Sequence, residues 1–446
     1  MNKIDKIYQT ADDRNKFGFD EVTSSAGDVQ QDAVGILLTK GGMMDGTDSA
    51  TARHEDEAKR NTNGTADVID RKGFAETYTV EECCEILDSQ RVPIKGSERS
   101  AGEYPYYGAN GIQDYVDDYI FDDELVLLAE DGGNFGSKTR PIAYRVSGKC
   151  WVNNHAHVLK PKSMIDVDYL CYSLMFYDTN GLVNGATRQK LTQATMRKMK
   201  IPKITLEEQL KIVEKLKKVQ GVITKKRKQL EGLDILIKAR FVEMFGNPED
   251  SSNEWEQKPL SDLLNVIGGY AFKSDQFSEI GGIPVLRIGN INAGVFRPVN
   301  MVYWEDDEKL ERYAIYAGDL VMSLTGTVGK DDYGNVCIMG NEYDKYYLNQ
   351  RNAKLEIKSG LDKYYLSELL KFECVKKKLT GISRGVRQAN ISNKDILNLV
   401  VNVPPIELQN QFAAFVTQVD KLKVEVQKSL DEMQILFDSL MQEYFG

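Results

Sequence analysis

Cysteine and histidine are scarce in this chain, which has six cysteines and three histidines among its 446 residues. The cysteines are widely scattered and form no C-x-x-C pair, so we expect reduced thiols and neither a disulfide framework nor a zinc site. His155 and His157 are two residues apart and would share one face of a strand, but no third ligand lies nearby. The sequence therefore predicts no bound metal ion, and it does not support a serine or cysteine catalytic triad.

Long apolar stretches are absent as well. No run of about eighteen apolar residues is available to cross a bilayer, and the beginning of the chain lacks the basic start and apolar centre of a secretory signal. We expect a cytoplasmic protein without a membrane segment. The hydrophobic share of 41% and the charged share of 28% are typical of globular domains, and the length predicts more than one of them.

Motifs for binding phosphate or a methyl donor are also missing. Residues 326–330 have the wrong spacing for a phosphate-binding loop. Amino-methylation of a base needs a glycine-rich turn and an Asn/Asp-Pro-Pro-aromatic clamp, and the nearest approach is residues 247–249, which follow Gly246 at a predicted helix end. A loop explains that segment better. We therefore expect no enzymatic activity from this chain alone and no cofactor bound to it.

The formal net charge of −10 argues against a protein that coats DNA with uniform positive charge. Part of the acidic excess lies in residues 1–77, which are rich in Gly, Asp, Thr and Asn and show no sustained apolar period, so we predict a weakly ordered extension. The densest basic run is residues 225–228. Such a run more often forms a solvated helix face than a phosphate site.

An internal repeat predicts the domain organisation. Residues 201–209 align with residues 403–411 and, after a two-residue gap, residues 228–231 align with residues 428–431. Each copy begins near a proline, has no later proline and spaces its apolar residues by three and four, as a coiled coil does. A helix of about forty residues is about 60 Å long. We therefore predict a helical spacer in each copy, with an ordinary core helix as the alternative.

The predicted seam residues are apolar and recur at helical spacing. They are Leu206, Leu210, Val213, Leu216, Val219, Ile223, Leu230, Leu233, Ile237, Phe241 and Met244 in the first copy, and Phe412, Phe415, Val419, Leu422, Val426, Leu430, Met433, Phe437, Leu440 and Tyr444 in the second.

The segments before the two helices correspond more faintly. A β-rich run ending in a glycine turn occurs at residues 125–133 and again at 320–326, and Arg188-Gln189 before the first helix parallels Arg387-Gln388 before the second. Runs of β-branched and aromatic residues broken by Gly and Asn predict twisted mixed sheets. Short helices are predicted at residues 167–176 and 364–374.

The predicted fold class is α/β (α+β), with two similar mixed-sheet domains, each followed by a long helix, and the two helices forming an antiparallel coiled coil. The predicted segments are 1–77, the acidic extension; 78–200, the first domain; 201–246, the central helical spacer; 247–402, the second domain; and 403–446, the C-terminal helical spacer.

Several short motifs in both domains match one known family. The first domain contains EILDS at 85–89, YPYYGANGI at 104–112, AEDG at 129–132 and VNNHAH at 152–157; the second contains Trp255, LSDL at 260–263, GIPVLRI at 282–288 and GDLVMS at 318–323. With the duplicated domain-plus-helix plan, residues 78–446 resemble a type I restriction-modification specificity subunit. One departure is the acidic extension, because members of the family usually begin close to the first recognition domain.

The resemblance implies a non-catalytic subunit that reads a bipartite target in double-stranded DNA and takes part in phage defence. It implies two modification subunits bound along the helices, which carry S-adenosylmethionine and methylate adenine, and a third, ATP-dependent restriction subunit that cuts. A standalone coiled-coil DNA-binding adaptor and the recognition part of a fused methyltransferase are the alternatives, and the missing methyltransferase motifs count against the second. A neighbouring methyltransferase gene would favour the main interpretation over the adaptor.

DNA reading needs Arg, Lys, Asn and Gln on loops, because these side chains form paired hydrogen bonds with base edges and contacts with phosphate. Asn153 and Asn349 are expected to brace their loops. The candidate DNA-binding residues are Tyr107, Asn110, Asn134, Lys138, Arg140, Asn154, Arg188, Gln189 and Lys190 in the first domain, and Lys273, Arg287, Asn290, Thr325, Thr327, Lys330, Gln350, Arg351, Arg384, Arg387 and Gln388 in the second.

Overall fold

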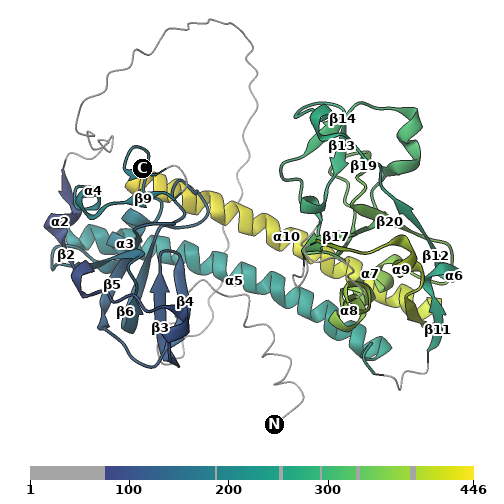
Figure 1. The fold of residues 1–446 in the computed structure, drawn as a ribbon, viewed down its shortest axis with the longest axis horizontal. Coiled ribbons are helices and arrows are strands. Elements are labelled where there is room, and N and C mark those ends of the chain that lie inside the picture. Colours follow the sequence, from purple (N-terminus) through teal and green to yellow (C-terminus); the bar gives the residue numbers. More distant parts are fainter. Residues whose placement is uncertain (1–75, 186–187, 251–254, 292–293, 328–331, 382–387) are drawn as a thin grey trace, which may run out of the picture. The chain divides into compact units, whose positions relative to one another are not determined.

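The computed structural model describes residues 76–446, apart from 186–187, 251–254, 292–293, 328–331 and 382–387 (Figure 1). Almost all of the predicted acidic extension therefore lies outside the described residues. The chain divides into two compact units. Unit 1 ends at Gln220 and also includes Leu436–Gly446, and unit 2 is Gly221–Ile435. The division falls inside both long helices, α5 (Leu206–Phe245) and α10 (Ile406–Phe445).

Unit 1 is built on a six-stranded mixed sheet. Its strands, in spatial order, are β2 (Cys84–Ile86), β7 (Ala156–Pro161), β5 (Phe121–Ala129), β6 (Ala143–Val152), β3 (Ala101–Gly108) and β4 (Gly111–Val116). Only the pairing of β3 with β6 is parallel among these described strands. The smaller elements are β1 (Thr77–Thr79), α2 (Val80–Cys83), η2 (Asp88–Gln90), η3 (Gly96–Glu98), α3 (Val167–Met175), β8 (Val183–Asn184), β9 (Lys190–Leu191), α4 (Gln193–Met196) and β10 (Lys200–Pro202).

Unit 2 distributes the equivalent strands over two four-stranded sheets. One has the order β12 (Leu264–Gly268), β20 (Asn352–Ile357), β16 (Leu320–Ser323) and β18 (Val336–Ile338); the other has β14 (Val302–Trp304), β13 (Ile283–Leu286), β19 (Tyr346–Leu348) and β15 (Ala314–Ile315). The remaining elements are β11 (Glu256–Pro259), α6 (Leu260–Leu263), η4 (Ser274–Gln276), η5 (Ile288–Asn290), η6 (Glu308–Tyr313), β17 (Thr325–Thr327), α7 (Lys363–Lys371), α8 (Glu373–Thr380), β21 (Gln388–Asn390), α9 (Asn393–Leu397) and β22 (Val400–Val403).

Asp side chains begin the two domain helices that the sequence predicts. The Asp166 carboxylate accepts from the backbone N–H groups at the start of α3, and Asp362 does the same for α7. The first predicted helix is confirmed. The second is interrupted, because the extended backbone of Phe372 separates α7 from α8.

The two units repeat the same connections at an offset of 200 residues in their helical parts. The amide of Asp166 donates to Gln209 Oε1 at 2.8 Å, and the amide of Asp362 donates to Gln409 Oε1 at 2.8 Å. Both long helices have 40 residues and begin at positions 206 and 406. The predicted offset of 202 with a two-residue gap is therefore wrong.

The error arose because the sequence alignment of the two helix starts was based on their prolines. Matching Pro202 with Pro404 gives the offset of 202, but a proline is tolerated at several positions around a helix start. The buried glutamine instead sets the register. Both Gln209 and Gln409 are fully buried, and their Nε2 groups donate to carbonyl oxygens of the loops on which the helices rest.

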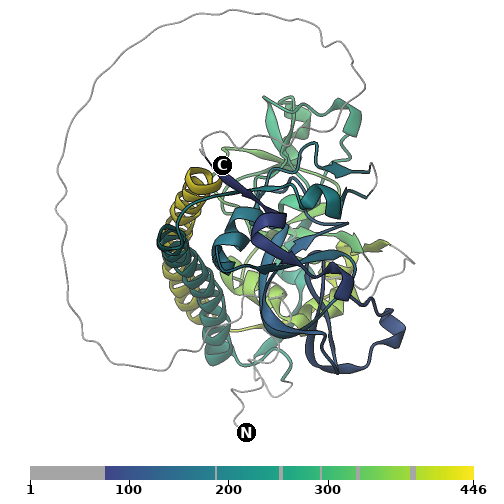
Figure 2. The same cartoon turned by 90° about the vertical axis from the view of Figure 1, so that its left-hand side faces the viewer.

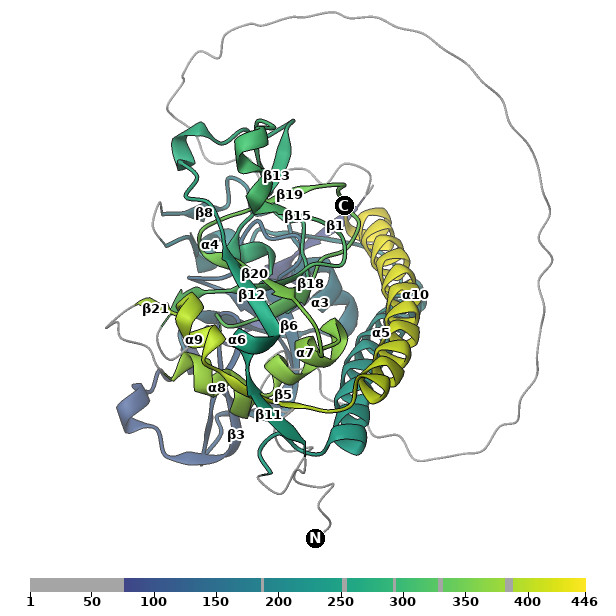
Figure 3. The same ribbon diagram turned by 90° about the vertical axis from the view of Figure 1, so that its right-hand side faces the viewer.

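Within each unit, α5 and α10 run antiparallel. In unit 1, Lys215 Nζ lies 3.2 Å from Tyr444 Oη, and in unit 2, Lys423 Nζ lies 2.5 Å from Asp234 Oδ1. Arg227 also contacts Gln434 in unit 2, so residue numbers fall along α10 as they rise along α5. The two helices lie side by side in both rotated views (Figures 2 and 3).

Most members of the predicted seam are buried or half-buried, but three are exposed. Leu206 is 45% exposed, Leu210 is 54% exposed and Leu422 is 56% exposed. At the start of α5 the polar Gln209, rather than Leu206 or Leu210, faces the domain. An apolar period does not predict a buried glutamine.

Aromatic side chains at the helix ends attach each unit to its helices. In unit 2, Phe245 packs edge-on against Tyr365 at 4.8 Å, and in unit 1, Phe445 packs against Tyr169 at 5.2 Å. Figure 3 shows α7, which carries Tyr365, on the side of the sheet that faces α5 and α10. None of the helices in the described ranges has both the length and the apolar content that crossing a membrane requires.

Candidate nucleic-acid interface

Four loops of unit 1 meet at one end of the strands of its sheet. Asn110 in the β3–β4 turn donates from Nδ2 to the carbonyl of Gly132 at 3.0 Å. The amide of Gly132 in turn donates to the carbonyl of Gln189 at 3.2 Å. The fourth loop joins through His155, whose carbonyl accepts from the amide of Glu130 at 2.9 Å. Segments far apart in the sequence are therefore fixed to one another by two backbone hydrogen bonds and one from the Asn110 side chain.

Charged side chains from these loops are paired in a defined geometry. Arg188 Nη2 lies 2.7 Å from Asp131 Oδ1, and His155 Nδ1 lies 2.6 Å from the same oxygen. The Arg188 side chain is 60% exposed, so it remains accessible from solvent while it is paired with Asp131. Lys190 Nζ lies 3.0 Å from Glu130 Oε1. An arginine oriented in this way has N–H groups left to bond the edge of a guanine.

Most of the candidate residues of the first domain are accessible. Asn134 is half-buried, and Tyr107 is 6% exposed with its ring 5.8 Å from that of Tyr144. Tyr107 therefore packs in the core, and we remove it from the candidate set. The exposed candidates are Asn110, Lys138, Arg140, Asn154, Arg188, Gln189 and Lys190.

Unit 2 repeats this frame with equivalent backbone hydrogen bonds. The amide of Asn349 donates to the carbonyl of Leu286, as the amide of Asn153 does to that of Tyr107 in unit 1. The amide of Leu324 donates to the carbonyl of Arg351 at 2.8 Å. Glu130 and Leu324 are thus equivalent, as are His155 and Arg351.

The same comparison corrects one predicted equivalence. The backbone of Lys190 forms an antiparallel β-bridge with that of Asp131 in unit 1, and Asn390 of β21 pairs with Thr325 of β17 in unit 2. Since Asp131 and Thr325 follow the equivalent Glu130 and Leu324, position 188 corresponds to 388. The predicted match of Arg188-Gln189 with Arg387-Gln388 is therefore wrong by one residue. The sequence comparison aligned the two identical Arg-Gln pairs, but the strand pairing sets a register that differs by one residue.

The candidates of the second domain fall into three groups. Lys330, Arg384, Arg387 and the side chain of Gln388 lie outside the described residues. Asn290 is 2% exposed, and its Nδ2 donates to the carbonyls of two nearby loop residues, so it braces the loop and we remove it from the candidate set. The exposed candidates are Lys273, Thr327, Gln350 and Arg351, and the half-buried ones are Arg287 and Thr325.

The two asparagines expected to brace their loops do so. Asn153 Oδ1 accepts from the amide of His155 at 2.8 Å, and Asn349 Oδ1 accepts from the amide of Arg351 at 3.3 Å. The structure also adds a residue that the sequence reasoning missed. Tyr270 is 38% exposed and its carbonyl accepts from the amide of Gln350, which places it beside the loop of Arg351. Its signal in the sequence was an aromatic residue directly after a glycine pair.

Comparison with known proteins agrees with this duplicated arrangement. The family model described as the type I restriction modification DNA specificity domain matches residues 74–232 and 252–432. This chain belongs to that family. A putative type I restriction enzyme specificity subunit of Haemophilus influenzae is 25% identical over 357 residues, covering 79% of this chain and 89% of that protein.

A second specificity subunit and a solved structure are also similar to this chain. The type I restriction enzyme MjaVIII specificity subunit of Methanocaldococcus jannaschii is 25% identical over 393 residues, covering 80% of this chain and 88% of that protein. The S subunit of a type I restriction-modification system from M. genitalium has a similar fold, with a TM-score of 0.52, 14% identity and coverage of 85% of this chain and 98% of that one.

One group of side chains in this family member has the spacing of a metal site. Asp88, Glu130 and His157 approach one another closely enough to share an ion. However, Arg91 Nη1 lies 2.6 Å from Glu130 Oε2, and both ring nitrogens of His157 already face oxygen atoms. The guanidinium supplies the positive charge there, so these residues do not fit a metal ion. His155 and His157 also bond to different carboxylates, which separates the pair that the sequence suggested.

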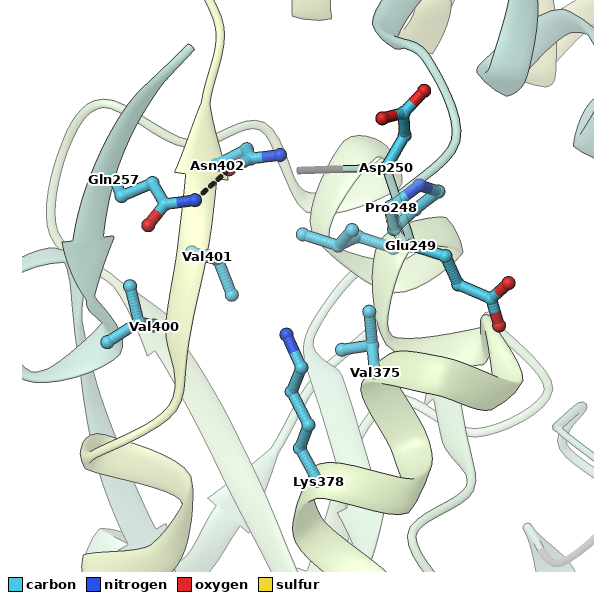
Figure 4. A pocket seen from close by; sticks show the side chains of 10 residues that line it. Pro248, Glu249, Asp250, Gln257, Val375, Lys378, Val400, Val401 and Asn402 are labelled. Carbon is cyan, nitrogen blue, oxygen red and sulfur yellow. Dashed lines mark hydrogen bonds between the residues drawn. The ribbon is translucent and has the colours of Figure 1, made fainter. Parts of the chain in front are cut away.

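A surface pocket of about 220 Å³ occurs in unit 2 (Figure 4). It is lined by residues 248–250 and by side chains such as Lys378 and Asn402, and Gln257 donates to Asn402 across one side. Among the candidate DNA-binding residues whose side chains the structure describes, none lines it. Residues 247–250 form a loop after α5, which confirms the predicted loop at Asn247.

Proposed function

We propose that the two loop surfaces read the two halves of a bipartite target in double-stranded DNA. The first reading surface consists of Asn110, Asn154, Arg188, Gln189 and Lys190. The second reading surface consists of Tyr270, Thr325, Thr327, Gln350 and Arg351.

The observation that carries this proposal is one backbone frame with different side chains at equivalent positions. Asn154 in the first reading surface corresponds to Gln350 in the second, and Arg351 of the second occupies the position of His155 in unit 1. A frame shared by the two units places both sets of side chains similarly with respect to a groove. Because different side chains form different hydrogen bonds with base edges, each surface would select its own sequence.

We further propose that the chain is not catalytic and positions two modification subunits for adenine methylation. The long helices expose apolar residues in pairs separated by 200 positions: Val222 and Leu422, Ile235 and Ile435, and Leu236 and Leu436 are 38% to 70% exposed. Exposed apolar side chains on a helix favour a partner protein. Their duplication favours two copies of the same partner, which would bring S-adenosylmethionine. An ATP-dependent restriction subunit would complete the complex.

Methylome sequencing tests the reading function. A strain that expresses this chain with its modification subunit should gain one methylated motif made of two specified runs separated by an unspecified spacer. Omitting this chain should abolish the motif. A continuous motif, or a motif that persists without the chain, would contradict the proposal, and DNA binding that needs no partner would favour the standalone adaptor instead.

The partner surface has its own test. Leu236→Arg and Leu436→Arg each place a charge at one member of an exposed pair, and each should reduce the bound modification subunits from two to one, as measured by mass from light scattering. The double variant should bind no modification subunit. Tyr316→Arg, at an exposed aromatic outside the helices, is the control and should retain both subunits.

A further inference from the structure

His157 lies at the centre of a buried group of charges beneath the first reading surface. Its ring is fully buried. Nδ1 lies 2.7 Å from Asp88 Oδ2, and Nε2 lies 2.9 Å from the carbonyl oxygen of Leu191. A neutral imidazole has one N–H and can donate to one of these acceptors, whereas the protonated ring donates to both. The geometry therefore suits the protonated form.

The charged groups around this ring come from three segments. Asp88 belongs to η2, and its Oδ1 accepts from the amide of Val158. Glu130 follows β5 and lies 3.6 Å from His157 Nδ1. Arg91 contacts both carboxylates, at 3.5 Å from Asp88 and 2.6 Å from Glu130. The half-exposed Lys190 side chain pairs with Glu130 from the solvent side.

Both carboxylates remain ionised in this setting. Burial raises the pKa of Asp88, but hydrogen bonds from His157, the Val158 amide and Gln193 outweigh it and hold that pKa below its usual value. Burial likewise raises the pKa of Glu130, and hydrogen bonds from Arg91 and Lys190 lower it further than burial raises it. Asp88 is thus an acceptor that needs a proton on the facing ring nitrogen.

The partners of His157 lead directly into the first reading surface. Glu130 precedes Asp131, which orients Arg188. Leu191 follows Lys190, and its amide also donates to the carbonyl of Glu130 at 2.7 Å. His157 itself follows the loop that ends at His155. The ring therefore connects three of the four loops that form the surface.

Unit 2 has no such group at the equivalent positions. Cys84 pairs with Pro161 in unit 1 as Leu264 pairs with Ile357 in unit 2, so Asp88 corresponds to Gly268 and His157 corresponds to Ala353. The equivalent of Glu130 is Leu324. Ala353 and Leu324 are 0% and 6% exposed. The same frame is thus held by ionic contacts in one unit and by apolar packing in the other.

We propose that protonated His157 is a positioning residue for the first reading surface alone. This inference rests on the proposed bipartite reading. Raising the pH removes one of its two donors and leaves a lone pair facing an oxygen, which loosens the loops that carry Arg188 and Lys190. Recognition of one half of the target then depends on pH, while recognition of the other half does not.

The experiment uses the complex assembled with its modification subunits. Methylation rates are measured on the full target and on duplexes with one base pair changed in either half, between about pH 6 and about pH 8.5, where histidine is the side chain that ordinarily changes charge. The half read by the first surface is identified with Arg188→Ala. Discrimination in that half should fall about tenfold as the pH rises, the effect of losing one paired base contact, and discrimination in the other half should stay constant.

Three variants assign the effect. His157→Gln keeps N–H donors that do not titrate and should make discrimination in the first half independent of pH. His155→Gln replaces the other nearby histidine, which bonds Asp131, and should retain the pH dependence. Asp123→Asn, which breaks an exposed ion pair with Lys160 in the same sheet, should retain it as well. If His157→Gln folds poorly, the triple variant Asp88→Gly, Glu130→Leu, His157→Ala installs the apolar set of unit 2 and should also remove the pH dependence.

A wild-type profile in His157→Gln, a flat profile in His155→Gln, or equal pH dependence in both halves would overturn the assignment to His157. These results differ from a failure of the proposed function. In that case no bipartite specificity would be found at any pH.

Discussion

Arg188 is oriented before any DNA is bound. Its guanidinium is held by Asp131 at 2.7 Å, and most of the side chain remains exposed. Replacement by Ala should lower discrimination at one base pair of the first half by about 1–3 kcal/mol and leave the second half unchanged. Methylation rates on single-substitution duplexes measure this. Lys160→Ala, which removes a cation on β7 away from the loops, is the matched control, and an equal loss with that variant would contradict a base-reading role for Arg188.

Some of the DNA-binding candidates could be predicted from the sequence, but the role of others could not. The polar, glycine-broken loops around Asn110 and Arg188 were predictable as candidates, because base-reading side chains occur on such loops. Tyr107 and Asn290 were indistinguishable from them in the sequence, since a residue that braces a turn and one that reads a base have the same chemistry. The burial of Tyr107 depends on packing against the distant Tyr144, and that of Asn290 depends on how the loop that follows it folds back to place two carbonyl groups on its side chain.

The buried glutamines connect each long helix to its domain. Gln209 bonds the Asp166 amide and two carbonyls, and Gln409 repeats this in unit 2. Replacing either by Ala leaves buried polar groups without partners and should lower the free energy of unfolding by about 1–3 kcal/mol. Denaturant unfolding measures the change. The exposed Gln427, replaced in the same way, should have little effect, and an equal loss there would argue against a docking role.

The helices themselves could be predicted because forty residues of apolar period carry a strong local signal. Their register could not, because it depends on strand pairing and on Gln209 and Gln409, which satisfy backbone groups far away in the sequence. The same limit applies to Leu206 and Leu210. They follow the apolar period but lie on the exposed side of α5.

Helix length should also set the spacing between the two half-targets. Four residues lengthen a helix by about 6 Å, and DNA rises about 3.4 Å per base pair. Inserting four residues after Gly221, where an added side chain would meet open space, with a matched insertion in α10 to keep the antiparallel register, should add one or two unspecified base pairs. Methylome sequencing would reveal the new spacer. An active insertion variant with the original spacer, or with altered half-sequences, would refute this prediction.

At the scale of the whole molecule, the chain is expected to contribute recognition and no chemistry. Calorimetric titration of the purified chain with S-adenosylmethionine should give no heat of specific binding, because the sequence has no clamp for the base and no glycine-rich cofactor turn. The complex with modification subunits should bind it. Tight stoichiometric binding by the chain alone would mean that the proposed division of labour is incorrect.

The central claim is that each reading surface specifies one half of the target. Its most direct test compares the methylomes produced with two variants, Arg188→Ala with Lys190→Ala in the first surface and Gln350→Ala with Arg351→Ala in the second. Each variant should relax one half of the motif and preserve the other half and the spacer. If either variant changes both halves, or if both variants change the same half, the two surfaces do not read separately.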